Sequence, residues 1–335
     1  MATKIAINGF GRIGRMVLRA LVESGRTDFE VVGINDLGAA TRLAHMLKYD
    51  SIHGKFPADL SANDSAIILN GKTIPVFSER DPANLPWKKL DVDIVLECTG
   101  FFLTQELAGK HISAGAKKVL ISAPAKDDTK TIVYGVNDSL INADDVIVSN
   151  ASCTTNALAP LLKVLNENYG VVSGIMTTIH AYTGDQPTQD SMHKDAYRGR
   201  AAALSMVPTT TGAAKAIGKV LPELNGKLEG VAIRVPTPNV SMVDLTVHVE
   251  KPVDAETVRK DFKAASEGVL KATLGFIEEP LVSVDLNHDP HSSSFASDQV
   301  YVTDSGLIRV LSWYDNEWGF SNRMLDTATV MAKFM

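Results

Sequence analysis

The chain has 335 residues, of which 45% are hydrophobic and 21% are charged, and its net charge is −6. These values favour a globular protein of two domains, exclude a disordered chain and argue against a nucleic-acid partner. There is no apolar run of membrane-spanning length, no signal-peptide pattern and only two cysteines, Cys98 and Cys153, so we expect a cytoplasmic protein with free thiols, no membrane contact and no metal site.

The first 150 residues alternate between buried strands and helices. Apolar runs, several rich in β-branched residues, predict strands at 4–8, 30–36, 93–100, 117–123 and 144–150. Helices are expected from Gly14 to about Ser24 and at about 39–49, and a hairpin-like insertion at about 50–80. Near-continuous apolar strands separated by helices are typical of a parallel sheet covered on both faces. The pattern predicts an α/β, doubly wound (Rossmann) parallel-sheet domain over residues 1–151.

The pattern changes after residue 150. A helix is expected at about 254–270, and strand-like segments lie at 246–252, 279–286, 298–304 and 307–315. Strands in succession indicate an α+β domain with a mostly antiparallel sheet, which we place at 152–316. The segment at about 317–335 is expected to form a terminal helix.

A glycine-rich turn joins the first strand to the first helix. Gly9, Gly11 and Gly14 form the pattern G-x-G-x-x-G, which permits a tight turn, close approach of a pyrophosphate and close packing of helix on strand. Asp36 ends the second strand, where a carboxylate binds a ribose 2′-hydroxyl and repels a 2′-phosphate. The motif predicts NAD as the cofactor, in preference to NADP. The alternative is a plain turn in which Asp36 caps a helix.

Cys153 follows a predicted strand and opens an apolar helix. A helix N-terminus stabilises a thiolate, so we expect a lowered thiol pKa and a nucleophile able to attack an aldehyde. His180, at the end of a strand-like run, could serve as the base. The alternatives are a buried structural cysteine and a hydrogen-bonded structural histidine. Cys98 lies in an apolar run and is assigned no role.

Groups suited to binding anions recur after Cys153. Backbone amides at a helix start, together with arginines, form phosphate sites. The candidates are Thr183, Arg198, Arg200, Thr209–Gly212 and Arg234, although a single arginine is more often part of a surface ion pair.

Six segments spread from end to end of the chain carry a closer resemblance. They are INGFGRIGR, SNASCTTN, HAYT, PTTTGAAKA, RVPTPNVS and WYDNEWG. Together they closely resemble phosphorylating glyceraldehyde-3-phosphate dehydrogenases. The resemblance implies oxidation of glyceraldehyde 3-phosphate with NAD and inorganic phosphate, through a thioester on Cys153, with His180 as base. It also implies a homotetramer and a C-terminal helix that packs on the first domain.

The resemblance further implies the binding residues. Those for the cofactor are Asn8, Gly9, Gly11, Arg12, Ile13, Gly14, Asp36, Arg80, Thr99, Ser122 and Asn316. Thr183 and Arg234 would hold the substrate phosphate, and Arg198 would serve one or both anions. The attacking phosphate would be held by Ser152, Thr154, Thr211 and Gly212.

This chain departs from the family pattern at four places. Ala157 stands where many members have a second cysteine, and Phe320 where tyrosine is common. The loop at 186–192 is unusual, which bears on the preference for NAD, and 196–200 contains fewer arginines than usual.

Two other functions remain open from the sequence. Segments such as LNHDPHSS also resemble erythrose-4-phosphate dehydrogenase, whereas Thr183, the 208–215 segment and Asp36 favour the triose enzyme. The second alternative is an NAD-binding paralogue without catalysis.

Overall fold

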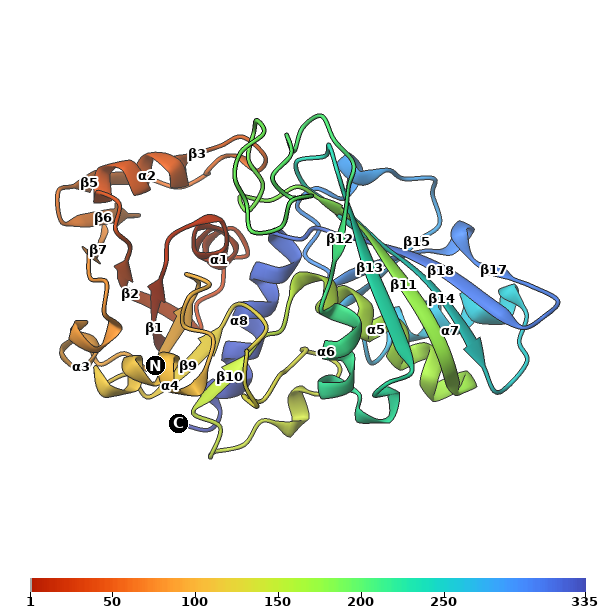
Figure 1. The fold of residues 1–335 in the computed structure, drawn as a ribbon. Coiled ribbons are helices and arrows are strands. Elements are labelled where there is room, and N and C mark those ends of the chain that lie inside the picture. Colours follow the sequence, from red (N-terminus) through yellow and green to blue (C-terminus); the bar gives the residue numbers. More distant parts are fainter. Residues whose placement is uncertain (1) are drawn as a thin grey trace. The chain divides into compact units, whose positions relative to one another are not determined.

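The computed structural model describes residues 2–335 (Figure 1). The chain divides into two compact units. The first comprises the chain up to Ile132, Asp138–Ala151 and Ser321–Met335, and the second comprises Val133–Asn137 and Ser152–Phe320. The C-terminal end of the chain therefore belongs to the same unit as its beginning.

A twisted sheet forms the centre of the first unit. Six of its strands run parallel in the order β10-β9-β8-β1-β2-β7. They are β1 (Thr3–Asn8), β2 (Phe29–Asn35), β7 (Lys72–Phe77), β8 (Ile94–Glu97), β9 (Lys118–Ile121) and β10 (Ile147–Ser149). The predicted doubly wound parallel sheet is confirmed, with β1 at the point where the strand order reverses.

Alternate residues of β1 enter two separate hydrophobic cores. Ile7 packs with residues of α1 and α2, and Ala6 packs with residues of α3 and α4. These helices are α1 (Arg12–Glu23), α2 (Ala40–Lys48), α3 (Trp87–Leu90) and α4 (Gln105–Ser113), and two 3₁₀ turns are η1 (Pro82–Asn84) and η2 (Asp138–Leu140). Both sheet faces are covered, as the continuous apolar runs predict.

The segment at 50–80 extends the main sheet. A small hairpin pairs β3 (Tyr49–Asp50) with β4 (Gly54–Lys55), and β5 (Leu60–Asn63), β6 (Ala66–Leu69) and β7 then run antiparallel. Asn70 and Gly71 turn the chain between β6 and β7 with φ of 50° and 78°, the conformation that tight hairpins require. Because β7 also pairs with β2, the predicted insertion is part of the parallel sheet.

The last helix is α8 (Trp318–Ala332). Arg26, after α1, donates to Asp326 Oδ1 (2.7 Å) and to Thr329 Oγ1 (2.6 Å). These contacts attach the C-terminal part of α8 to the first unit.

The second unit contains a sheet in the order β12-β13-β11-β14-β18-β16-β15, with β17 paired to β18. Its pairs are antiparallel except β11/β13 and β15/β16, which confirms the predicted mostly antiparallel sheet. The strands are β11 (Val171–Ala181), β12 (Val207–Thr210), β13 (Leu228–Val235), β14 (Ser241–Val249), β15 (Leu274–Ile277), β16 (Ser293–Ala296), β17 (Tyr301–Val302) and β18 (Leu307–Tyr314).

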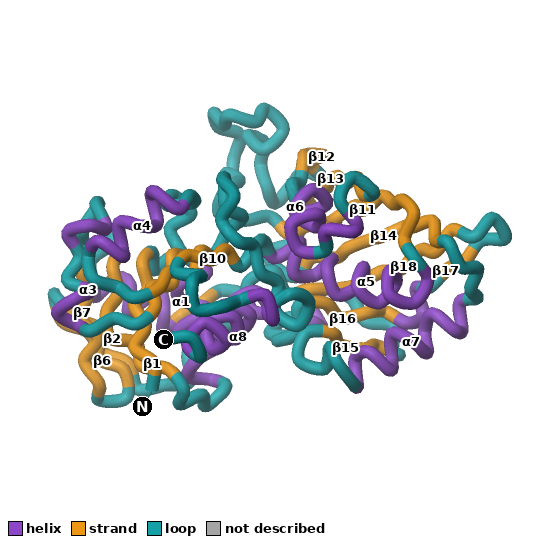
Figure 2. The backbone as a smooth tube through the Cα atoms, turned by 90° about the horizontal axis from the view of Figure 1, so that it is seen from below, coloured by secondary structure: helices purple, strands orange, loops and turns teal. Residues whose placement is uncertain are grey.

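Helices lie against one face of this sheet. The elements are α5 (Cys153–Tyr169), α6 (Ala213–Val220) and α7 (Ala255–Glu267), with 3₁₀ turns η3 (Pro222–Leu224), η4 (Ser283–Leu286) and η5 (Ser297–Gln299). Figure 2 shows α5 and α7 beside the strands, and α5 contacts β11, β14, β16 and β18. Met176, Thr178 and His180 of β11 are buried, whereas Ile175 is 53% exposed, so the other face of the sheet carries exposed apolar side chains.

The prediction of a strand at 279–286 is wrong. The structure has an irregular stretch followed by η4, where the Asp285 carboxylate accepts a hydrogen bond from the Val282 amide at 2.9 Å. A local bond of this kind competes with strand pairing, and Pro280 offers no amide hydrogen. The strand expected at 298–304 is reduced to the two residues of β17.

Across residues 2–335 none of the helices has both the length and the apolar composition needed to cross a membrane.

Candidate active site

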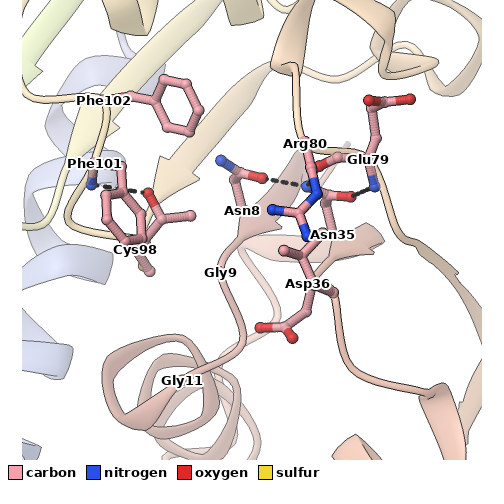
Figure 3. Close-up of a pocket in the computed structure, with 12 residues that line it drawn as sticks. Asn8, Gly9, Gly11, Asn35, Asp36, Glu79, Arg80, Cys98, Phe101 and Phe102 are labelled. Atoms are coloured by element: carbon pink, nitrogen blue, oxygen red, sulfur yellow. Dashed lines mark hydrogen bonds between the residues drawn. The ribbon is translucent and has the colours of Figure 1, made fainter. Parts of the chain in front are cut away.

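A cavity of about 500 Å³ lies at the carboxyl ends of β1, β2 and β8 in the first unit (Figure 3). In open α/β sheets, ligands bind outside the carboxyl ends of the strands at the reversal of strand order. The lining residues are Asn8, Gly9, Gly11, Asn35, Asp36, Leu37, Glu79, Arg80, Cys98, Thr99, Phe101 and Phe102.

The three glycines of the turn fit a dinucleotide. A Cβ on Gly9, whose φ is +90°, would lie 2.7 Å from Thr99 N, and a Cβ on Gly14 would lie 2.1 Å from Gly9 O. These two positions have no room for a side chain. A Cβ on Gly11 would have no neighbour within 4 Å, so the space above Gly11 is open to a ligand. The cradle matches what a pyrophosphate at the start of α1 requires.

Asp36 presents its carboxylate at the same cavity. Oδ2 accepts from the Phe10 amide and Oδ1 from the Gly38 amide, each at 2.8 Å. The two bonds fix the side chain at the end of β2, where a ribose hydroxyl binds in dinucleotide folds.

The structure brings together six of the predicted cofactor residues at this cavity: Asn8, Gly9, Gly11, Asp36, Arg80 and Thr99. Arg12 instead forms an ion pair with Asp50, and Ile13 and Ser122 do not line the cavity. Asn316 lies in the second unit, where its Oδ1 accepts from Ser241 Oγ. Sequence reasoning missed Asn35, Leu37, Glu79, Phe101, Phe102 and Cys98, although their positions at strand ends were a usable signal.

The second site begins at the N-terminus of α5. Ala151 has a φ of +58°, a conformation that non-glycine residues rarely adopt, and it turns the chain from β10 into the helix. Ser152 caps the helix, because its Oγ accepts from the Thr155 amide at 3.0 Å. Cys153 is therefore the first residue of α5, as predicted.

His180 faces this cysteine from the end of β11. Its Nε2 lies 3.6 Å from Cys153 Sγ, and its Nδ1 lies 2.7 Å from Ala181 O. A carbonyl oxygen can only accept, so the neutral ring carries its proton on Nδ1. The lone pair of Nε2 then points at the sulfur, which suits a base that takes the thiol proton.

Burial holds this pair in its neutral form. Burial raises the pKa of the Cys153 thiol, although Arg234, Thr154 and the helix-terminal amides act in the opposite direction. Burial and the positive charge of Arg234 together lower the pKa of His180 to about 3. The expectation of a lowered thiol pKa is therefore wrong for the resting site, because desolvation exceeds the effect of the helix terminus.

Arg234 stands beside His180 in the register of β13 on β11. Its guanidinium donates to Ala181 O at 3.0 Å and to Thr183 Oγ1 at 3.4 Å. The structure therefore gathers Cys153, His180, Thr183 and Arg234 in one place within the second unit. A half-buried cation beside a hydroxyl is suited to binding a phosphate group.

Arg198 and the start of α6 form an adjacent group. Arg198 donates to Thr209 Oγ1 (3.0 Å) and to Asp185 Oδ2 (2.9 Å). Thr211 and Gly212 precede α6, and Thr211 Oγ1 accepts from the Ala213 amide. By contrast, Arg200 forms an exposed ion pair with Asp190.

Two of the predicted phosphate ligands have their hydroxyls engaged. Ser152 Oγ caps α5, and Thr154 Oγ1 lies 3.0 Å from Tyr314 OH. Either residue would have to contact an anion through its backbone amide or after its hydroxyl turns.

A dinucleotide cradle in one unit and a cysteine–histidine pair with neighbouring cations in the other define a nicotinamide-dependent dehydrogenase that acts on an anionic substrate. Two family models match the chain: the NAD-binding domain of glyceraldehyde 3-phosphate dehydrogenase over residues 3–105, and the C-terminal domain of the same enzyme over 152–316. The chain belongs to the glyceraldehyde-3-phosphate dehydrogenase family, an oxidoreductase family that uses NAD.

Relatives match over nearly the whole length. A glyceraldehyde-3-phosphate dehydrogenase of Cereibacter sphaeroides is 58% identical, with 100% of both chains covered. Those of Xanthobacter flavus and Geobacillus stearothermophilus are 57% and 55% identical, with 99% of both chains covered in each case.

Proposed function

We propose that this protein oxidises glyceraldehyde 3-phosphate with NAD and inorganic phosphate, giving 1,3-bisphosphoglycerate through a thioester on Cys153. The observation that carries the proposal is Nε2 of His180 facing Sγ of Cys153 at 3.6 Å, with Arg234 bonded to the neighbouring carbonyl. In this assignment the first unit is the NAD-binding domain, the second is the catalytic domain, and α8 packs on the former.

In the first step, His180 acts as the proton acceptor for Cys153. The substrate phosphate binds Arg234 and Thr183, and its negative charge offsets the cation that lowers the pKa of His180. His180 Nε2 can then take the thiol proton as Sγ bonds to the aldehyde carbon. His180 passes that proton to the carbonyl oxygen, which gives a hemithioacetal on Cys153 and returns the imidazole to its neutral form.

His180 also acts in the second step, in which it removes the hydroxyl proton of the hemithioacetal. The cofactor NAD would supply the hydride acceptor, and the residues that would hold it are Asn8, Gly9, Gly11, Arg12, Ile13, Gly14, Asp36, Arg80, Thr99, Ser122 and Asn316. Loss of that hydride and proton leaves a thioester on Sγ.

The third step uses the second anion site. Inorganic phosphate is held by Ser152, Thr154, Thr211 and Gly212, with Arg198 nearby. A phosphate oxygen attacks the thioester carbon, the C–S bond breaks, and the acyl phosphate leaves. Cys153 takes up a proton and returns to its thiol form.

We further propose that the protein is a cytoplasmic homotetramer. Support for assembly comes from the sheet face without helices, where Ile175 and Val231 are 53% and 46% exposed. Exposed apolar side chains on a sheet face that carries no helices are suited to a subunit interface. The two free cysteines suit a reducing compartment.

The test is the rate of NAD reduction with glyceraldehyde 3-phosphate and with erythrose 4-phosphate, each with and without inorganic phosphate. We expect preference for the triose and a single burst without phosphate. Preference for the tetrose with no need for phosphate would instead support an erythrose-4-phosphate dehydrogenase.

Cys153→Ser is the matched variant. It should bind NAD as the parent does and lose turnover by roughly a thousandfold or more, as expected when a covalent nucleophile is removed. A non-catalytic paralogue would show no burst in either form. Steady turnover by the serine variant would overturn the thioester mechanism.

A further inference from the structure

A buried carboxylate lies behind the NAD cavity without lining it. Glu97 ends β8 and is 1% exposed. Its Oε2 accepts from Asn8 Nδ2 (2.5 Å) and from His111 Nε2 (3.0 Å). Its Oε1 accepts from the amide (2.8 Å) and the hydroxyl of Thr99. Donors therefore converge on both oxygens, and the site requires an acceptor at each.

The direction of the His111 bond is fixed by Trp87. The indole Nε1 of Trp87 donates to His111 Nδ1 at 3.0 Å, and an indole can only donate. Nδ1 is therefore the acceptor, and the proton of the neutral ring is on Nε2, facing Glu97. Both Trp87 and His111 are fully buried, so water cannot supply a substitute partner.

The direction of the Asn8 bond is fixed from the other side. The backbone amide of Glu79 donates to Asn35 Oδ1 at 2.9 Å, which orients the Asn35 amide. Asn35 Nδ2 then donates to Asn8 Oδ1 at 2.7 Å (Figure 3). This leaves Asn8 Nδ2 to donate to Glu97. A backbone group at one end and an indole at the other thus direct two donors at one oxygen.

We infer that Glu97 is a positioning residue for NAD binding, which acts by holding the cavity-lining Asn8 and Thr99 in place. Thr99 is the critical contact, because its amide nitrogen lies only 2.7 Å from the position that a Cβ on Gly9 would take. The carboxylate thus sets the surface opposite the glycine turn. The inference rests on the assignment of this cavity to NAD.

The network predicts that glutamine is a poor replacement for Glu97. An amide presents one acceptor and one donor group. If the glutamine NH₂ took the place of Oε2, it would face the N–H groups of Asn8 and His111, whose directions are fixed. If the glutamine NH₂ took the place of Oε1, it would face the backbone N–H of Thr99. In either orientation an N–H group of the amide therefore faces another N–H group in a buried place, and neither has an acceptor.

The experiment measures the Kd of NAD by calorimetry for full-length Glu97→Gln, Thr99→Ala and the double variant. We expect each single change to weaken binding, by roughly tenfold for Glu97→Gln. In the double variant, the increase in Kd should be much smaller than the product of the two single increases, because the effects of residues that act as a unit are not additive. The inference would be overturned if the two single increases in Kd multiplied in the double variant, or if the Kd of Glu97→Gln lay within twofold of that of the parent. A parent that failed to bind NAD would instead refute the cofactor assignment.

Trp87→Phe provides a second variant if Glu97→Gln does not fold. Trp87 does not line the cavity, so an effect on NAD must pass through His111 and Glu97. Phe77→Leu is the matched control, since Phe77 packs edge-on against Trp87 at 6.0 Å and is not part of the network. At equal loss of thermal stability, Trp87→Phe should weaken NAD binding and Phe77→Leu should not. Equal Kd values for the two variants would contradict the positioning role.

Discussion

His180 links the acid stability of the protein to its active site. Burial and Arg234 lower its pKa to about 3 from the usual 6.5. Between these values the unfolded chain binds the extra proton, so stability falls as the pH drops from 6.5 towards 3. His180→Gln removes the contribution of this imidazole to the pH dependence of stability. Urea unfolding between pH 7 and pH 4 should therefore give a shallower loss of stability for the variant, by at most about 1.4 kcal/mol per pH unit.

The control for this prediction is His53→Gln, which replaces a histidine of the first unit. That variant should follow the pH dependence of the parent. If His180→Gln also ran parallel to the parent, the imidazole would not be held neutral in the folded protein.

We expect Asp36 to set the choice between NAD and NADP by its charge. Asp36→Asn keeps an oxygen for one of the two amides that Asp36 binds, but it removes the repulsion of a 2′-phosphate. We expect the ratio of kcat/KM for NADP to that for NAD to rise about tenfold, as for the loss of about 1.4 kcal/mol of discrimination. Asp64→Asn, an exposed turn residue, changes the net charge equally and should leave the ratio unchanged. An unchanged ratio in Asp36→Asn would place cofactor discrimination elsewhere.

At the scale of elements, the N-terminus of α5 carries Cys153, the proposed nucleophile. Ser152→Ala removes the cap and should cost about 1 kcal/mol, while loosening the turn that contains Cys153. Thr104→Ala removes the corresponding cap of α4, where Thr104 Oγ1 accepts from the Leu107 amide at 3.2 Å. Both variants should lose similar stability, but only Ser152→Ala should change the rate at which Cys153 is alkylated. Site-specific mass spectrometry in phosphate-free buffer measures this rate. Equal rates in both variants would show that the cap does not influence the reactivity of the Cys153 thiol.

Elements with strong local signals were predictable from the sequence. The turn at Gly9–Gly14 and the start of α5 combine a buried strand, a polar turn and an apolar helix, and both lie where they were expected. The segment at 279–286 failed because its apolar residues suit a strand, whereas Asp285 binds a backbone amide three residues earlier. A hydrogen bond from a single side chain to the backbone, which competes with strand pairing, leaves no periodic pattern in the sequence.

The whole-molecule arrangement of polar groups was much less predictable. Cys153 and His180 were found as candidates, but the pairing of Nε2 with Sγ depends on how α5 packs against β11. Glu97 was missed because Asn8, its partner, is 89 residues away, and its neighbours in sequence are apolar. The neutral state of the active-site pair was missed for a related reason, since burial by the folded chain outweighs the helix terminus that the sequence displays.

At the largest scale, the uncovered sheet face of the second unit predicts how copies of the chain assemble. Val231 lies on this face, beside Thr177 in the register of β13 on β11. A lysine there would place charges in an apolar contact between copies, so Val231→Lys should yield species smaller than the parent in light scattering after gel filtration. Val269→Lys is the matched control, because Val269 is 82% exposed after α7 and lies outside the sheet. That variant should keep the mass of the parent. If Val231→Lys kept it too, with unchanged thermal stability, the exposed sheet face would not be a subunit interface, and the apolar side chains of the segment at 192–206 would become the next candidates for one.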